Sequence, residues 1–299
     1  MKRYTREELR LKLQQRLDAK LPILACEAGV GLTAKMTQKE DIDLIFITTA
    51  AMFRMRGLDD SNALKAYGCA NEDTWEQVRR MNRVIREVPV VAGISANDPR
   101  LVLDEQLSLY EHAHVSGIIN SPSVGPVQQS MRRDFSNTDD MGICVEKDML
   151  KYAQERDFFS VYQAYFEHDA LDFAAQKPDM IVINMDYSVE PGANPETYRD
   201  HDRFPEFYYR MFNPAWMEEV DGCLRAMQDL YERIKAISPE TFVLVAGGPF
   251  IEMENVRSLF RQTDLDGILG GVLLEENVIR ESIGKHQAAL QSIRIAEGE

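Results

Sequence analysis

An acidic side chain ends the first apolar run of the chain, where a carboxylate is costly. Residues 25–36 read ACEAGVGLTAKM, and Glu27 closes the run LPILACEAG. A carboxylate in such a segment loses solvation free energy unless it is paired or used. We therefore interpret Glu27 as a candidate general acid or base, and Asp186, which follows the apolar run MIVINM, as a second. Lys35 is the cation that completes this candidate catalytic set.

Glycines make the same stretch look like a phosphate loop, but both standard patterns fail. The Walker pattern needs Gly-Lys-Ser/Thr, whereas Ala34 precedes Lys35 and Met36 follows it. The dinucleotide pattern needs a third glycine where Ala34 stands after Gly29 and Gly31, which leaves a weak match. We interpret the stretch as the end of a strand and the loop after it, in which the glycines let the backbone approach a ligand.

Two glycine pairs follow later apolar runs. Gly247-Gly248 comes after TFVLVA, and Gly270-Gly271 lies near the end of DGILGG. Backbone N–H groups in such loops can bind an anion and stabilise an enolate or oxyanion, although tight turns explain the same glycines. The candidate substrate-binding residues are Gly29, Gly31, Arg54, Asn71, Asn120, Ser123, Gln163, Gly247, Gly248 and Gly270.

Oxygen ligands for a divalent cation are also present. Asp186 and Glu190, together with Glu27, form a hard oxygen set that suits Mg²⁺. We treat Asp186 and Glu190 as the candidate metal ligands and Mg²⁺ as the candidate cofactor. Two Asp-x-Asp pairs, 41–43 and 264–266, also resemble ligands, but they precede their apolar runs. Ligands bind at the opposite end of a parallel barrel, so we expect no metal at these pairs.

Eight apolar runs provide the scaffold that brings these residues together. Helix-like stretches separate most of the runs, which are rich in Val, Ile and Phe and do not alternate strictly. Strands of this kind are covered on both faces, as in parallel sheets with crossover helices. The sequence therefore predicts an α/β fold, a (β/α)₈ TIM barrel, with a doubly wound open sheet as the alternative. The runs are LPILACEAG, IDLIFITTA, VPVVAGIS, SGIINSPSVG, FFSVYQAYF, DMIVINMDYS, TFVLVAGGPF and DGILGGVLLE.

An additional helix precedes the barrel pattern. Thr5 begins the motif T-R-E-E, in which Thr5 and Glu8 can form a capping box, and leucines then recur every fourth residue. No Pro/Gly/Ser-rich linker interrupts the later pattern. We expect residues 1–20 to form an N-terminal helix that packs on the barrel and residues 21–299 to form a single (β/α)₈ domain.

Two connections are longer than ordinary barrel loops. They span residues 50–73 and 187–213, and the second is rich in Tyr and Phe. Long loops are usually lids, binding loops or subunit contacts. The aromatic density of 187–213 is too apolar for a solvated linker, so we expect either a substrate lid or an oligomer contact. On this basis we expect a homo-oligomer.

Composition excludes several classes of partner. The formal net charge is −15 and the pI is about 4.9, so the surface repels nucleic acid and anionic membranes. The apolar runs are too short to span a bilayer, and the charged N-terminus has no apolar signal core. We expect a cytoplasmic protein whose four widely spaced cysteines are reduced. A small anionic metabolite remains a suitable partner, because local donors can override net charge.

Several stretches occur in an order that resembles a known family. ACEAGVGLTAK, FRMRG, YGCANE, GIINSPSVG, MGICVEKDM and VAGGPF together resemble the phosphoenolpyruvate hydrolase-like TIM-barrel proteins, also called TIM-barrel signal transduction proteins. The resemblance covers residues 20 to 280 approximately. It implies a barrel of the phosphoenolpyruvate/pyruvate type, which acts on small 2-oxo acids or enol phosphates, often with Mg²⁺. The matching positions are Gly29, Gly31, Lys35, Arg54, Gly68, Asn71, Asn120, Pro122, Gly125, Gly142, Glu146, Gly247, Gly248 and Pro249.

The chain also departs from the pattern of that family. A glycine usually stands where this chain has Glu27, and histidines stand near the ends of the sixth and seventh strands, where Asn184 and Ala246 occur here. Asp186 replaces a small residue. If those histidines are catalytic, the chemistry here has been lost or has moved to carboxylates.

These observations predict an enzyme, a hydrolase or lyase that acts on a small anionic 2-oxo-acid or enol-phosphate-like substrate. Glu27 or Asp186 would transfer protons, and Lys35 and Arg54 would hold a carboxylate or phosphate. Two alternatives stay open at this point. The barrel could be a catalytically diverged module that binds a metabolite or a partner, or it could be an isomerase or aldolase-like carbon–carbon lyase.

Overall fold

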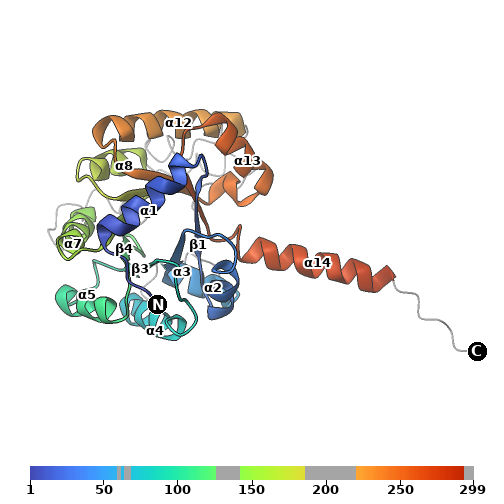
Figure 1. Cartoon of the computed structure of the whole chain (residues 1–299), viewed down its shortest axis with the longest axis horizontal. Coiled ribbons are helices and arrows are strands. Elements are labelled where there is room, and N and C mark those ends of the chain that lie inside the picture. The colour runs from blue at the N-terminus through green and yellow to red at the C-terminus, as the bar shows by residue number, and fades with distance from the viewer. Residues whose placement is uncertain (59–61, 64–68, 126–141, 186–219, 293–299) are drawn as a thin grey trace, which may run out of the picture.

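The computed structural model describes residues 1–58, 62–63, 69–125, 142–185 and 220–292, and these form a closed barrel of parallel strands (Figure 1). The strands are β1 (Ile23–Glu27), β2 (Leu44–Ile47), β3 (Val90–Ile94), β4 (Gly117–Asn120), β5 (Phe159–Ala164), β6 (Met180–Asn184), β7 (Phe242–Ala246) and β8 (Gly267–Gly270). Neighbours in the sequence are neighbours in the sheet, and β1 pairs with β8 to close it. The predicted (β/α)₈ barrel is confirmed, and the open-sheet alternative is wrong.

Helices surround the barrel, as crossover connections between parallel strands require. The described helices are α1 (Arg6–Asp18), α2 (Gly31–Thr37), α3 (Thr49–Met55), α4 (Ala70–Met81), α5 (Leu103–His112), α7 (Ile143–Glu155), α8 (Glu167–Ala174), α12 (Val220–Ile237), the 3₁₀ helix η2 (Gly248–Ile251), α13 (Met253–Gln262) and α14 (Glu276–Ser292). No helix of the described residues is both long and apolar enough to cross a membrane.

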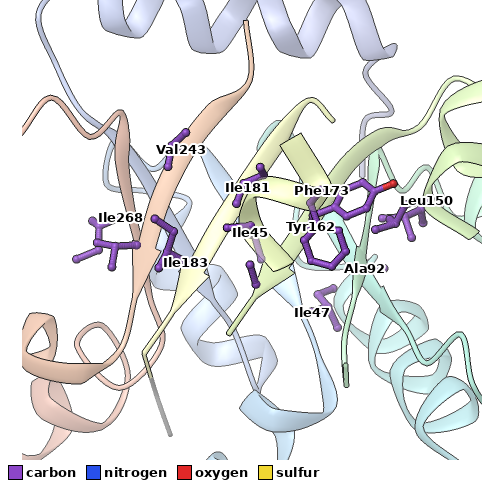
Figure 2. Packing of buried hydrophobic residues seen from close by; sticks show 14 of the residues in the cluster. Ile45, Ile47, Ala92, Leu150, Tyr162, Phe173, Ile181, Ile183, Val243 and Ile268 are labelled. Atoms are coloured by element: carbon purple, nitrogen blue, oxygen red, sulfur yellow. The ribbon is translucent and has the colours of Figure 1, made fainter. Parts of the chain in front are cut away.

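Alternation along each strand divides the core into two layers. On β2, Leu44 and Phe46 face the barrel interior, whereas Ile45 and Ile47 belong to the layer between strands and helices. Figure 2 shows this outer layer, in which Tyr162 of β5 lies against Phe173 of α8 with ring centroids 4.6 Å apart. Residues two apart on a strand therefore share a layer. A polar strand residue can face a ligand inside the barrel only if it belongs to the inward-facing layer.

Helix α1 closes the N-terminal end of the barrel. Its capping box forms as predicted, since the Thr5 hydroxyl accepts from the Glu8 N–H at 3.1 Å and the Glu8 carboxylate accepts from the Thr5 N–H at 2.8 Å. Leu9 and Leu13 are fully buried and join the interior cluster. Figure 1 shows α1 lying across the barrel opening. The helix thus plugs the end of the barrel that faces away from the strand C-termini.

The two Asp-x-Asp pairs, 41–43 and 264–266, stabilise the same end of the barrel. Asp43 accepts from the Leu24 N–H at 2.9 Å, and Asp266 accepts from the Val243 N–H at 2.8 Å. Lys235 pairs with Asp266 at 2.8 Å. These carboxylates tie neighbouring strands together. Among the described residues no group of three His, Cys, Asp or Glu side chains could hold a metal ion.

Helix α14 departs from the barrel pattern. It projects away from the strands instead of lying against them (Figure 1). Val278, Ile279 and Ile283 are exposed on it, with Ile283 60% accessible. The connection 187–213, expected to be a lid or an oligomer contact, lies outside the described residues.

The plug formed by α1 can be tested by stability measurements. Leu13→Ala should lower the free energy of unfolding by about 2–5 kcal/mol, because it leaves a cavity in the interior cluster. Leu11→Ala, on the same helix at a side chain that is 59% exposed, should change it by less than about 0.5 kcal/mol. Urea unfolding followed by circular dichroism measures both. Equal losses would contradict the packing of α1 on the barrel.

Candidate active site

A pocket of about 340 Å³, including the solvent at its mouth, opens where the strands of the barrel end. The lining residues that matter chemically are Glu27, Gln163, Asn184, Gly247, Gly270 and Gly271. The alternation of inward and outward side chains along a strand explains the position of three of these residues, Glu27, Gln163 and Asn184. Glu27 continues the inward series of Ile23 and Ala25, and Gln163 and Asn184 continue the inward series of β5 and β6. The pocket is therefore the polar top layer of the barrel interior.

Glu27 is held from two sides at the wall of this pocket. Its Oε1 accepts from the Thr48 hydroxyl, and its Oε2 lies 2.9 Å from the Arg54 guanidinium. Thr48 immediately precedes α3, the helix that carries Arg54. The Glu27 side chain is 12% exposed, and that of Arg54 is 4% exposed. A carboxylate fixed in this way is aimed at the pocket while its partner stays behind it.

A second carboxylate completes the cluster. Glu275, which directly precedes α14, lies 3.4 Å from the Arg54 guanidinium and accepts from the Gly29 N–H at 2.8 Å. Burial raises the pKa of Glu275, which the Gly29 N–H and Arg54 oppose. A Cβ at Gly29 would come 2.1 Å from the Ala51 carbonyl oxygen. Gly29 therefore lets α3 pack close to the loop and does not present its N–H to a ligand.

Gln163 carries an unsatisfied polar atom at the wall of this pocket. Its side chain lines the pocket, yet its Oε1 is buried and has no hydrogen-bond partner among the described residues. Buried polar atoms are normally paired, so an unpaired one at a pocket wall indicates a ligand partner. A carboxamide carries both an N–H donor and a C=O acceptor, so the group can offer either to a ligand.

Glycine turns form the rim of the pocket beside β7 and β8. Gly247 has φ 69° and Gly248 has φ 58°, conformations that favour glycine. Gly247 and Gly270 line the pocket, whereas Gly248 begins η2. Gly247 and Gly270 therefore bring backbone to the pocket wall, and the anion binding expected of these glycine pairs stays a prediction.

Asn120 has a role different from the predicted ligand contact. It shares the outward series of Ile118, so it faces α7 and is fully buried. Its side chain donates to the Glu146 carboxylate and accepts from the Gln163 N–H at 2.7 Å. Ser123 also donates to Glu146, at 2.9 Å. These two residues support the wall of the pocket from outside the barrel.

Asn71 acts in a similar way on β3. Its Nδ2 donates to the Ser95 carbonyl at 3.1 Å, and its Oδ1 accepts from the Ser95 N–H at 2.8 Å. Both ends of the carboxamide are used, so the predicted substrate contact is replaced by a clamp on the strand end.

Other predicted residues do not reach the described pocket. Lys35 is exposed on α2, and Gly31 begins that helix. Arg54 stands behind Glu27 and is not among the lining residues. Asp186 and Glu190, the candidate metal ligands, lie outside the described residues. The structure therefore brings together Glu27, Gln163, Gly247 and Gly270 from the predicted set.

The thiol next to Glu27 does not belong to the site. Burial raises the pKa of Cys26 to about 12, and the negative charges of Glu275 and Glu27 add to this effect. A thiol with such a pKa is rarely ionised at neutral pH and is a poor nucleophile. Cys26 is fully buried on β1 and acts as a structural strand residue.

Two important carboxylates were missed as functional candidates by reasoning from residue patterns. Glu275 ends the apolar stretch GGVLLE, so the desolvation argument that singled out Glu27 applies to it equally. Glu146 appeared only as a position shared with a family. It lies in a helix of mixed polarity, and nothing in the local pattern shows that its side chain is fully buried.

Comparisons with known proteins place this geometry in context. The sequence profile of the phosphoenolpyruvate hydrolase-like family matches residues 8–206. The ToMV susceptible protein tm-1(GCR26) of Solanum lycopersicum is 26% identical over 273 residues, which are 91% of this chain and 34% of that protein. The chain therefore spans about a third of the length of this relative.

Solved structures share the fold at low sequence identity. The phosphoenolpyruvate phosphomutase of Streptomyces platensis subsp. rosaceus has a TM-score of 0.55 and 14% identity, covering 94% of this chain and 87% of that one. A phosphonopyruvate hydrolase in complex with oxalate and Mg²⁺ has a TM-score of 0.53 and 12% identity, covering 97% and 92%. These likenesses establish the barrel architecture.

The buried Glu146 predicts a pH dependence of stability. Burial raises its pKa from 4.5 to about 7, against hydrogen bonds from Asn120, Val124 and Ser123, and Asp169 adds to the rise. Between these pH values the folded state retains a proton that the unfolded state releases. The protonated Glu146 carboxyl therefore adds to the free energy of unfolding. This contribution is fully present below pH 4.5 and is lost as the pH rises through 7. Its size is ~3 kcal/mol.

Comparison with Glu146→Gln isolates this effect, because glutamine does not titrate. From pH 5 to pH 8 the free energy of unfolding of the parent should fall relative to that of the variant. Denaturant unfolding at several pH values measures this. Asp148→Asn, at an exposed position of the same helix, is the control and should show no such trend. A constant difference between parent and Glu146→Gln would contradict the assignment.

Proposed function

Because the chain belongs to the phosphoenolpyruvate hydrolase-like family, we propose that it is a hydrolase or lyase acting on a small anionic 2-oxo acid or enol phosphate. The observation that carries this proposal is the pocket at the strand C-termini, with the Glu27 carboxylate on its wall beside the Gln163 Oε1, which is unpaired among the described residues. Ligands of barrel enzymes bind at this end. The proteins of similar fold include a phosphonopyruvate hydrolase that binds oxalate, a dianion of the proposed size.

The residues at the pocket divide the chemistry between them. Glu27 is the proton-transferring group, because its carboxylate is fixed by Thr48 and Arg54 yet lines the pocket. Gln163 would hydrogen-bond the substrate, and backbone N–H groups of Gly247 and Gly270, which line the pocket, would stabilise developing negative charge. Arg54 positions Glu27 and does not bind the substrate directly. Asp186 remains the proposed second acid or base.

Mg²⁺ is the proposed cofactor, and the donor chemistry of the pocket fits it. Mg²⁺ is commonly held by one or two carboxylates together with water and substrate oxygens. Glu27 and the Gln163 Oε1 provide oxygen donors at the described pocket, and Asp186 and Glu190 would add carboxylates. When bound, Mg²⁺ supplies Lewis-acid polarisation of a substrate oxygen. Oxalate binding with and without Mg²⁺, measured by calorimetry, tests this without relying on turnover.

A homo-oligomer is part of the same proposal, and α14 is its contact. Glu275, held by Arg54 and the Gly29 N–H, fixes the point from which α14 leaves the barrel. The helix therefore carries Val278, Ile279 and Ile283 away from its own barrel. The helices around the barrel also expose apolar side chains, Leu32 on α2 and Met253 on α13. A second copy of the chain can cover both surfaces.

Glu27→Gln tests the catalytic assignment. We expect turnover of the best substrate among phosphonopyruvate, phosphoenolpyruvate and oxaloacetate to fall by about 10²–10⁴-fold, since glutamine cannot transfer the proton. Oxalate binding and thermal stability of the variant show whether the pocket is intact.

Glu40→Gln changes the net charge equally at an exposed site and serves as the control. Unchanged turnover in Glu27→Gln would remove Glu27 from the mechanism. A parent protein that neither turns over the panel nor binds oxalate would overturn the proposed function and favour a partner-binding module.

The oligomer contact has a separate test. Ile283→Lys should shift the protein to a smaller mass in size-exclusion chromatography with light scattering, because a charge replaces an apolar contact in the interface. Glu281→Gln changes the net charge by the same amount on the other side of the helix. It should leave the mass unchanged. A monomeric parent protein would exclude this contact.

A further inference from the structure

A side chain takes the place of backbone pairing where β4 and β5 approach the pocket. The ladder between these strands ends at the pair Ile119 and Val161. Beyond it, Asn120 Oδ1 accepts from the Gln163 N–H at 2.7 Å, and Asn120 Nδ2 lies 3.2 Å from the Gln163 carbonyl oxygen. The backbone of Gln163 is therefore held by one carboxamide.

The orientation of this carboxamide is fixed from behind by Glu146. Asn120 Nδ2 donates to Glu146 Oε2 at 2.5 Å, and Ser123 Oγ donates to the same oxygen. The Val124 N–H donates to Oε1 at 2.7 Å. Both Glu146 oxygens accept hydrogen bonds here, so the carboxyl group selects the Asn120 rotamer that turns Nδ2 outward and Oδ1 toward the Gln163 N–H.

The chain of contacts ends at the pocket. Gln163 lies on the inward series of β5, and its Oε1 has no partner among the described residues. Glu146 is fully buried and shielded from the pocket by Asn120 and β5. It therefore has no direct access to a ligand, but it determines the position of a residue that does.

We propose that Glu146 is a positioning residue for ligand recognition, acting through Asn120 to hold the Gln163 carboxamide at the pocket wall, where its amide nitrogen can donate to an anionic oxygen of the bound substrate. The ligand part of this inference rests on the proposed function. The positioning part rests only on the contacts from α7 through β4 to β5. An apolar side chain at position 146 leaves the Asn120 and Val124 donors without acceptors and loosens the end of β5.

Amide hydrogen exchange tests the positioning part without any ligand. In Glu146→Met, exchange at the Gln163 amide should become about tenfold faster, because the acceptor that orients Asn120 is gone. Glu146→Gln retains one acceptor oxygen and should show an intermediate rate. Exchange in β3 should be unchanged. If Glu146→Met does not fold, Ser123→Ala, which removes a single donor to the carboxylate, should show a smaller increase at the same amide.

Oxalate binding in the presence of Mg²⁺ tests the ligand part. Glu146→Met should weaken binding about tenfold in the parent background and should have no further effect when Gln163 is replaced by leucine. Asp266→Asn removes a buried carboxylate at the opposite end of the barrel and is the matched control. It should lower stability without changing oxalate affinity or exchange at Gln163.

The outcomes separate the two levels of the inference. Unchanged exchange at the Gln163 amide in Glu146→Met overturns the positioning role. Equal losses of oxalate affinity in the parent and in the Gln163→Leu background also overturn it, because Glu146 would then act by another route. If the parent protein neither binds oxalate nor turns over the panel, the proposed function fails, and the exchange rates alone decide whether Glu146 positions Gln163.

Discussion

The site depends on one buried guanidinium held between two carboxylates. Arg54 of α3 contacts Glu27 at the end of β1 and Glu275 at the start of α14. These segments meet at the seam where the barrel closes, because β1 pairs with β8. Removing one partner from a buried ion cluster typically costs about 3–5 kcal/mol. The contacts of Arg54 therefore aim Glu27 into the pocket and set the point from which α14 leaves the barrel.

Polar side chains continue the sheet where its backbone ladder ends. Asn71 clamps the Ser95 backbone beyond β3, and Asn120 clamps the Gln163 backbone of β5 beyond the last β4–β5 pair. A strand end without such partners would leave buried N–H and C=O groups unpaired, which is costly. The carboxamides satisfy these groups and make the strand ends rigid. A pocket built on such ends keeps its geometry without direct contact between the supporting residues and the ligand.

Some residues line the pocket, and others support its wall from outside the barrel. This difference explains which of them the sequence could identify. Apolar runs separated by helical stretches predicted the barrel, because each strand must be buried on both faces. Glu27 was found because an acid at the end of such a run is costly. Asn120 was assigned to the ligand because it ends a strand, although the outward series of Ile118 would have turned it toward the helices. Glu275 was overlooked, although it ends the apolar stretch GGVLLE. The burial of the Glu146 side chain depends on packing between elements that are distant in the sequence, and no local sequence pattern indicates it.

The negative charge at the pocket favours a cationic cofactor such as the proposed Mg²⁺. The described lining residues include the Glu27 carboxylate and no cationic side chain, and Arg54 is already shared by two carboxylates. A dianionic substrate beside Glu27 would place like charges together in a site with restricted solvent, which is strongly unfavourable. Backbone N–H groups of the glycine turns carry partial charges only. Among the described lining residues no cationic side chain supplies the compensating charge. A divalent cation would supply this charge and uses oxygen donors such as Glu27, so the proposed substrate class and the proposed cofactor support each other.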